Sequence, residues 1–320
     1  EDLEKIPMLE LSDIKREPAK DYNDVKSVDG IKIVHHNIFT NKIAYINMSF
    51  DTKCVPDELI PYMGLLGSTL SLMDTKNYTY PELTNEININ CGGLATGTAL
   101  YSDKVDFSKN TIVYEVKSKA LYEKVPFVLG MMEEIMYNTR FDDYKRLKEI
   151  IARIKSRLEA SLMGQGHSIA MLECCAQFSE SAYYSDILRG YKYYEFIKKL
   201  DEEFEQNKTQ IVDKLNKLVG YIFNKDNVIV SLTADDEGYD CFVKALSAKS
   251  CNIKDEHYNT AVRSFIPVNV KTGYTSASQV QYVARCGNFV KDGYKYTGAL
   301  KVLKVIFSYD YLWINVRVKG

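Results

Sequence analysis

Strand-like and helix-like segments interleave along this chain, and their order constrains the fold more than any other feature of the sequence. Residues 43–50 alternate apolar and polar side chains, which is typical of a half-buried strand. The apolar run 31–34 precedes them, with a turn at Thr40-Asn41-Lys42, so the two segments predict a β-hairpin. Residues 142–163 instead carry apolar side chains at helical spacing.

Strands that follow one another without an intervening helix argue against a regular strand–helix–strand repeat. The pattern therefore predicts an α+β fold, in which helices cover a mixed or antiparallel sheet. Further helices are expected over residues 59–73, 80–91, 125–137, 168–179, 191–218, 237–247 and 296–308, and further strands over 94–101, 111–118, 227–233, 279–286 and 312–318.

The length of 320 residues suggests two domains, on a prior of roughly 150 residues per domain. We expect residues 1–28 to form a linker or entering arm and residues 29–250 a complete α+β domain. Residues 251–320 are expected to be a connector with the incomplete start of a second, similar domain. Because the chain begins at Glu1 rather than Met and stops just after the strand expected at 312–318, we expect it to be a piece of a longer protein.

Charge and cysteine usage exclude several classes of protein. The chain has 41 Lys and Arg against 43 Asp and Glu, a net charge of −2, so it lacks the basic character typical of nucleic-acid binding. No apolar run approaches the roughly 20 residues that span a bilayer, and no signal peptide is recognisable. Seven scattered cysteines without a C-x-x-C pair fit a reducing compartment, which makes the cytoplasm the expected location.

The four histidines, at positions 35, 36, 167 and 257, form no recognisable zinc motif, since none stands in an H-E-x-x-H or H-x-x-E-H spacing. One other chemistry stays open. His167 lies seven residues before Cys174, close to two helical turns, so a thiol of the Cys174-Cys175 pair could serve as a nucleophile. A pair of buried thiols explains the same residues without any catalysis.

Arg317 stands among apolar residues of the strand expected at 312–318. A guanidinium in such surroundings is costly unless it pairs with a carboxylate or faces a ligand. On physical grounds alone, a partner carboxylate and a bound substrate explain Arg317 equally well.

Several short motifs resemble a known family. They are Leu59-Ile60-Pro61-Tyr62-Met63-Gly64-Leu65-Leu66, Tyr80-Pro81-Glu82-Leu83 with Glu86-Ile87, Cys91-Gly92-Gly93, Tyr311-Leu312-Trp313-Ile314-Asn315-Val316-Arg317-Val318-Lys319-Gly320, and, near the start, Leu3-Glu4-Lys5-Ile6-Pro7 and Asp29-Gly30. In their order and spacing, they resemble the C-terminal half of inverted-motif zinc metallopeptidases. The branch is that of presequence protease and falcilysin, within the insulinase, or pitrilysin, family.

The resemblance implies a clamshell of two halves, each built from two similar α+β domains, around a chamber in which unfolded peptides are cut. Zinc and the H-x-x-E-H motif would belong to the N-terminal half, because the helix expected at 59–73 has no His or Glu where ligands would stand. In this chain we therefore expect no catalytic residue, no metal ligand and no cofactor. Arg317 matches an arginine that binds the substrate or transition state across the clamshell.

The resemblance implies a function as well: the non-catalytic C-terminal portion of a zinc-dependent oligopeptidase, which supplies chamber wall and substrate contacts. The full-length enzyme would hydrolyse peptide bonds, with peptides and its own N-terminal catalytic half as partners, whereas this chain alone would be inactive. Two alternatives are an inactive insulinase-like scaffold or interaction protein, and a hydrolase that depends on Cys174 or Cys175. Neither nucleic acid nor a membrane is an expected partner.

Overall fold

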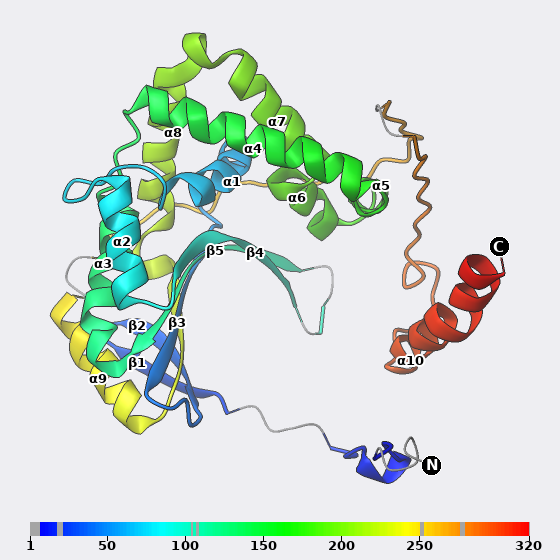
Figure 1. Ribbon diagram of the computed structural model, residues 1–320, viewed down its shortest axis with the longest axis horizontal. Coiled ribbons are helices and arrows are strands. Elements are labelled where there is room, and N and C mark those ends of the chain that lie inside the picture. Colours follow the sequence, from blue (N-terminus) through cyan, green and yellow to red (C-terminus); the bar gives the residue numbers. More distant parts are fainter. Residues whose placement is uncertain are drawn as a thin grey trace.

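A six-stranded mixed sheet lies at the centre of the fold (Figure 1). The computed structural model describes residues 7–17, 22–103, 105–106, 109–249, 253–275 and 279–319. Along the sheet the strands follow the order β1-β2-β6-β3-β5-β4. Only the β2–β6 pair is parallel among these neighbours. The bounds are β1 Asp24–Val28, β2 Ile31–Asn37, β3 Ile43–Asp51, β4 Leu94–Ser102, β5 Asn110–Leu121 and β6 Val228–Ala234.

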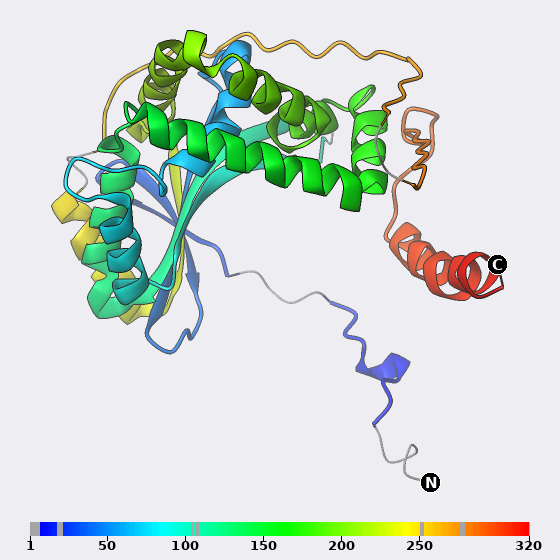
Figure 2. The ribbon, with the colours of Figure 1, turned by 45° about the horizontal axis from the view of Figure 1, so that its top comes forward.

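Helices pack on one face of this sheet (Figures 1 and 2). The α-helices are α1 Ile60–Thr69, α2 Tyr80–Asn90, α3 Val125–Tyr137, α4 Tyr144–Gly164, α5 Gly166–Ala176, α6 Glu180–Arg189, α7 Tyr191–Glu202, α8 Phe204–Ile222, α9 Asp236–Lys249 and α10 Ala299–Ile306. A π-helix, η7 Phe307–Val318, follows α10, and the 3-10 turns are η2 Leu11–Asp13, η3 Asp57–Leu59, η4 Tyr122–Lys124 and η5 Lys225–Asn227. Within the described residues, no helix combines the length and the apolar character that crossing a bilayer requires.

The alternation within the strands explains why one face of the sheet is covered. In β3, Ala44, Ile46, Met48 and Phe50 are at most 3% exposed, whereas the residues between them reach solvent to different degrees. The inner face of the sheet meets the helices around Phe223, whose ring packs edge-on against the ring of Phe50 at 5.1 Å between centroids. The core is therefore a single layer between the sheet and its helices.

The predicted hairpin of residues 31–34 with 43–50 is wrong, although both segments are strands. β6 lies between them, parallel to β2 and antiparallel to β3. Alternation identifies a strand but not its neighbour, and β6 offers the same alternating buried face. The tight hairpin instead joins β1 to β2 through Asp29 and Gly30, which both have positive φ as a two-residue loop requires. β1 thus lies within the segment that we expected to be an irregular arm.

The predicted helices are confirmed within a few residues, except that 191–218 is not one helix. It divides into α7 and α8, and an additional helix, α6, precedes it. Gly190 joins α6 to α7 with a ψ of −150°. A Cβ at Gly190 would clash with Asp186 Oδ1 and would lie 2.8 Å from Asp186 Cα. Only glycine fits this junction without a shift of the backbone.

The two strands predicted at 279–286 and 312–318 are not strands. Residues 279–286 are irregular, and residues 312–318 lie within η7. A strand needs a neighbouring strand for its backbone hydrogen bonds, and these residues have no place in the sheet of the described chain. A period-two sequence pattern therefore has no partner here, and large apolar side chains of η7 remain exposed, Trp313 by 57%.

Candidate functional site

The face of the sheet opposite the helices carries a polar cluster, the Glu115 cluster, formed by Asn47, Tyr101, Glu115 and Lys117 of strands β3, β4 and β5. Glu115 lies at its centre and is only 6% exposed. Asn47 Nδ2 and the Tyr101 hydroxyl each donate to Glu115 Oε1 over 2.9 Å. Lys117 Nζ lies 2.6 Å from Glu115 Oε2. Three neighbouring strands thus converge on one carboxylate.

The Glu115 cluster keeps this carboxyl group ionised. Burial raises the pKa of Glu115, but the hydrogen bonds from Lys117, Asn47 and Tyr101 outweigh it, so the pKa falls below its ordinary value of 4.5. Burial, and then the bond to Glu115, raises the pKa of the Tyr101 hydroxyl. Asn47 Oδ1 is buried and has no hydrogen-bond partner in the described part of the chain. The cluster therefore combines a satisfied carboxylate with one acceptor that a ligand could fill.

Arg317, which the family resemblance assigned to the substrate, does not lie in the Glu115 cluster. It lies in η7, in the C-terminal helices that stand apart from the sheet (Figures 1 and 2). There it lines an open depression of about 370 Å³ with Ser308, Leu312, Trp313 and Val316. Among the described residues no carboxylate pairs with Arg317, so the partner-carboxylate explanation finds no support.

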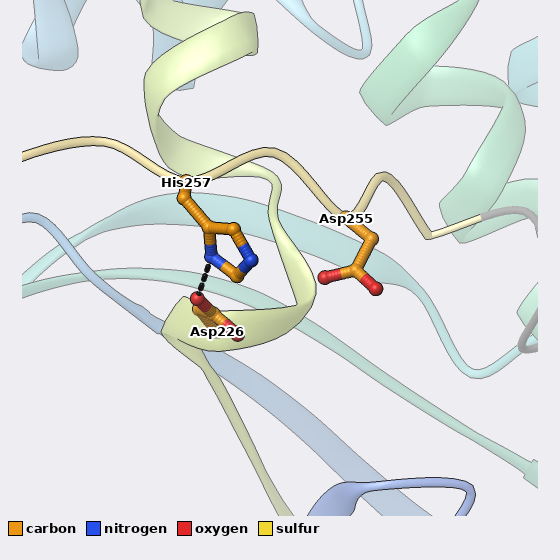
Figure 3. A group of neighbouring side chains, drawn as sticks. All are labelled: Asp226, Asp255 and His257. Carbon is orange, nitrogen blue, oxygen red and sulfur yellow. Dashed lines mark hydrogen bonds and ion pairs between the residues drawn. The ribbon is translucent and has the colours of Figure 1, made fainter.

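Asp226, Asp255 and His257 form a group of potential metal ligands (Figure 3). One donor atom of each lies within 4.8 Å of the others, and all three residues are exposed. His257 Nδ1 hydrogen-bonds to Asp226 Oδ2. The Lys225 N–H donates to the Lys254 carbonyl over 2.8 Å and brings the connector back to η5, a juxtaposition that sequence spacing could not reveal. The group lacks the buried, supported ligand shell of a structural metal site.

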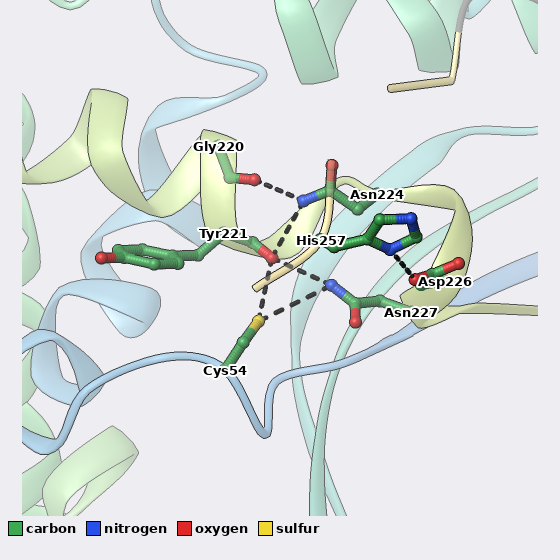
Figure 4. A network of polar contacts seen from close by, with 7 residues as sticks. All are labelled: Cys54, Gly220, Tyr221, Asn224, Asp226, Asn227 and His257. Atoms are coloured by element: carbon green, nitrogen blue, oxygen red, sulfur yellow. Dashed lines mark hydrogen bonds and ion pairs between the residues drawn. The ribbon is translucent and has the colours of Figure 1, made fainter. Parts of the chain in front are cut away.

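A second polar network closes the end of α8, beside this group (Figure 4). Asn227 Nδ2 donates to the carbonyls of Tyr221, over 2.9 Å, and Ile222, over 3.2 Å. Cys54 Sγ also donates to the Tyr221 carbonyl, over 3.1 Å, and Asn224 Nδ2 reaches the same oxygen over 3.2 Å. These donors satisfy carbonyls that a helix end leaves without partners. Since burial raises the pKa of the Cys54 thiol, we assign this network to structure rather than to chemistry.

His167, Cys174 and Cys175 all lie on α5, yet the structure does not pair them as base and nucleophile. The His167 ring faces the ring of Tyr282, at 6.1 Å between centroids. Within the described residues, no hydrogen bond joins His167 to either thiol. Burial, followed by contact with Cys286, raises the pKa of the Cys174 thiol, and a protonated thiol is a poor nucleophile. The geometry gives the Cys-dependent hydrolase no support.

Glu115 was not among the predicted site residues, although the sequence carried a signal for it. Its neighbours in β5, Tyr114 and Val116, are fully buried, and a carboxylate inside such a strand needs hydrogen-bond partners. The identity of those partners could not be read from the sequence, because Asn47 is 68 positions away and on another strand.

Comparison with known proteins identifies the family. The model that describes the region associated with subfamily C of the M16 peptidases matches residues 1–200. The chain belongs to this family. Its relatives among curated proteins include presequence proteases, so the predicted likeness to the presequence protease branch is confirmed.

The relatives of this peptidase-associated chain are much longer than the chain itself. It is 38% identical to Protein HypA of Clostridium perfringens, over 100% of this chain and 33% of HypA. It is 27% identical to presequence protease 1, chloroplastic/mitochondrial, of Arabidopsis thaliana, over 100% of this chain and 30% of that protein. The mitochondrial presequence protease of Drosophila melanogaster is 25% identical, over 98% of this chain and 30% of its own length. The chain spans about a third of the length of these relatives.

A solved structure shares the fold of this peptidase-associated chain. The crystal structure of a conserved protein from Enterococcus faecalis V583 superposes with a TM-score of 0.53 at 12% identity, over 74% of this chain and 54% of that one. At this identity the likeness concerns the fold alone. Together with the observed sheet and helices, it confirms the predicted α+β class.

Proposed function

We propose that this chain is the non-catalytic C-terminal portion of a zinc-dependent oligopeptidase, and that it supplies wall and substrate contacts to a chamber in which unfolded peptides are cut. The observation that carries the proposal is the Glu115 cluster on the helix-free face of the sheet. A polar face with a satisfied carboxylate and a free acceptor suits contact with a peptide. The match to presequence proteases over the whole chain supports the same function.

Helix α1 does not fit a zinc ion. It corresponds to the helix on which the resemblance would place the metal ligands, yet none of its residues, Ile60–Thr69, is His, Cys, Asp or Glu. Tyr62, Met63, Leu65 and Leu66 are buried in the core instead. The zinc ion and the water that it activates would therefore belong to another part of the full-length protein, and no step of the reaction is assigned to residues of α1.

Arg317 would contribute a positive charge to substrate binding. Its guanidinium is exposed, lines an open depression and pairs with no carboxylate of the described chain. A free guanidinium can hold the scissile carbonyl or the oxyanion that forms from it. This role requires that the full-length protein bring Arg317 to the zinc-bearing part.

The partners and the compartment follow from this proposal. Unfolded peptides and the catalytic half of the same protein would be the partners. The relatives carry both bacterial and organellar names, since HypA comes from a bacterium and the presequence proteases are named chloroplastic or mitochondrial. A cytoplasmic location therefore remains a proposal for this chain.

The experiment compares this chain with the full-length protein. Both are purified, their zinc content is measured, and each is incubated with a quenched fluorescent unstructured peptide, with and without a chelator. We expect chelator-sensitive cleavage by the full-length protein only, and no stoichiometric zinc in the chain alone. Cleavage by the chain alone, or one tightly bound zinc ion per chain, would contradict the proposal. A zinc-free, inactive full-length protein would instead favour the scaffold alternative.

A further inference from the structure

The two edges of the sheet differ in how they are protected. β1, at one edge, has five residues, and two of them, Asp24 and Lys26, are charged. β4, at the other edge, has nine residues and neither a charge nor a proline, Leu94 to Ser102 reading LATGTALYS. Natural proteins protect exposed edges with short strands, charges or prolines, because unpaired backbone groups invite another strand. β4 has none of these devices.

The register of the sheet shows which backbone groups of β4 are free. The Asp103 N–H donates to the Lys109 carbonyl over 2.9 Å, in continuation of the β4–β5 ladder. In an antiparallel ladder every second residue bonds to the partner strand, so the odd-numbered residues of β4 bond to β5. The even-numbered residues direct their N–H and C=O groups outward: Leu94, Thr96, Thr98, Leu100 and Ser102. No backbone or side-chain group of the described chain hydrogen-bonds to these outward groups.

The edge strand is braced on one face and clear on the other. On the helix side, a Cβ at Gly67 of α1 would lie 3.2 Å from Gly97 Cα, so α1 supports β4 at close range. Thr96 Oγ1 donates to the Gly67 carbonyl over 3.0 Å and fixes the same contact. On the other face β4 presents the small residues Ala95, Gly97 and Ala99, and a Cβ at Gly97 would meet nothing within 4 Å. The edge is therefore held in place and sterically open.

We propose that β4 is a strand-addition site, at which an unfolded peptide binds in extended conformation as a further strand of the sheet. This inference rests on the proposed function and assigns a site and a binding mode to the peptide. The row of alternating donors and acceptors along nine residues is matched only by an extended backbone, and not by a helix or a loop. Because β4 offers backbone groups and small uncharged side chains, it accepts peptides of varied sequence.

The test measures binding without cleavage, so its outcome is independent of whether the full-length protein is a zinc peptidase. The probe is a fluorescein-labelled peptide, Lys-Thr-Val-Thr-Val-Thr-Val-Thr-Lys, titrated with the 320-residue chain and followed by fluorescence anisotropy. One version carries N-methyl groups on alternate residues, which leaves one edge of the peptide able to donate. The other version is N-methylated on every residue and has no donor. We expect the first to bind and the second to bind at least tenfold more weakly, whereas equal affinities would overturn the proposal.

A pair of variants locates the site. Thr98→Pro removes an outward N–H and leaves the ladder to β5 intact, because proline is tolerated at an edge whose N–H faces solvent. Thr98→Val keeps the N–H and the shape of the side chain. We expect Thr98→Pro to bind the half-methylated peptide at least tenfold more weakly than Thr98→Val, with unchanged circular dichroism for both. Equal binding by two folded variants, or a dimer that Thr98→Pro dissociates and that excludes the peptide, would overturn the proposal. If Thr98→Pro fails to fold, the two peptides on the unmodified chain still decide the question.

Discussion

Gly97 of β4 and Glu115 of β5 are direct partners across the ladder at the edge of the sheet. The partner of this buried carboxylate thus has no side chain, and it is Tyr101, further along β4, whose hydroxyl covers Glu115. The carboxylate depends on three donors from other positions rather than on its direct neighbour. Its contribution to stability can therefore be tested by substitution.

Glu115→Gln should lower the free energy of unfolding at pH 7 by about 1–2 kcal/mol, because the amide keeps an acceptor for Asn47 and Tyr101 but loses its pairing with Lys117. The pKa of Glu115 is lowered in the folded chain, so its contribution is complete above pH 4.5 and is lost as the pH falls through the folded value. Urea denaturation at a series of pH values measures this. The variant should lose less stability than the unmodified chain below pH 4.5, and the exposed control Glu123→Gln should behave like the unmodified chain. Parallel pH profiles for the unmodified chain and Glu115→Gln would contradict the assignment.

Gly190→Ala should destabilise the fold by about 2–3 kcal/mol, because the added Cβ would lie 2.8 Å from Asp186 Cα, a backbone atom that cannot easily move. Gly220→Ala is the matched control, since the nearest neighbour of its Cβ would be the Tyr258 hydroxyl at an ordinary 3.5 Å. Within α8 that change should be neutral or stabilise by up to about 1 kcal/mol. Thermal unfolding of both variants checks the contrast, and equal melting temperatures would show that the α6–α7 junction tolerates a side chain.

Asn227→Ala should lower the free energy of unfolding by about 1–3 kcal/mol, because two carbonyls at the end of α8 lose a buried donor. Asn227→Asp should be worse at neutral pH, since a carboxylate cannot donate and would face the Tyr221 and Ile222 carbonyls. A protonated carboxyl group can donate, so the Asp variant should approach the unmodified chain as the pH falls. Chemical denaturation at pH 7 and at about pH 4 tests the order of the variants. An Asp variant as stable as the unmodified chain at pH 7 would remove Asn227 from the cap.

Arg317→Ala, made in the full-length protein, should lower kcat at least tenfold and raise KM less, if the guanidinium stabilises charge that develops in the transition state. The depression around Arg317 includes no carboxylate that could account for the charge. Arg317→Lys should restore part of kcat, because it keeps the charge but not the paired donors. Steady-state kinetics on one quenched peptide gives both constants, and an unchanged kcat would leave Arg317 with a structural role.

The sequence predicted which segments are helices and strands far better than how the strands pair. The helix predicted at 125–137 matches α3 to the residue, because the apolar spacing and Pro126 mark its face and its start. The pairing of β2 with β6 joins residues almost 200 positions apart, and nothing local encodes it. The Glu115 cluster fails for the same reason, since its donors meet only once the sheet is assembled. The strand predicted at 312–318 shows the converse, because a correct local alternation has no partner strand to satisfy it.

The insertion of β6 between β2 and β3 also determines when this sheet can form during synthesis. Val228, where β6 begins, leaves the ribosome long after β2 and β3, and at about 5–20 residues per second the interval is roughly 10–40 seconds. During that time β2 and β3 each lack the strand that separates them, and their apolar faces have no completed sheet to join. Pairing at such long range is slow even in the finished chain. The nascent protein should therefore depend on chaperones that bind extended segments until residue 234 has emerged.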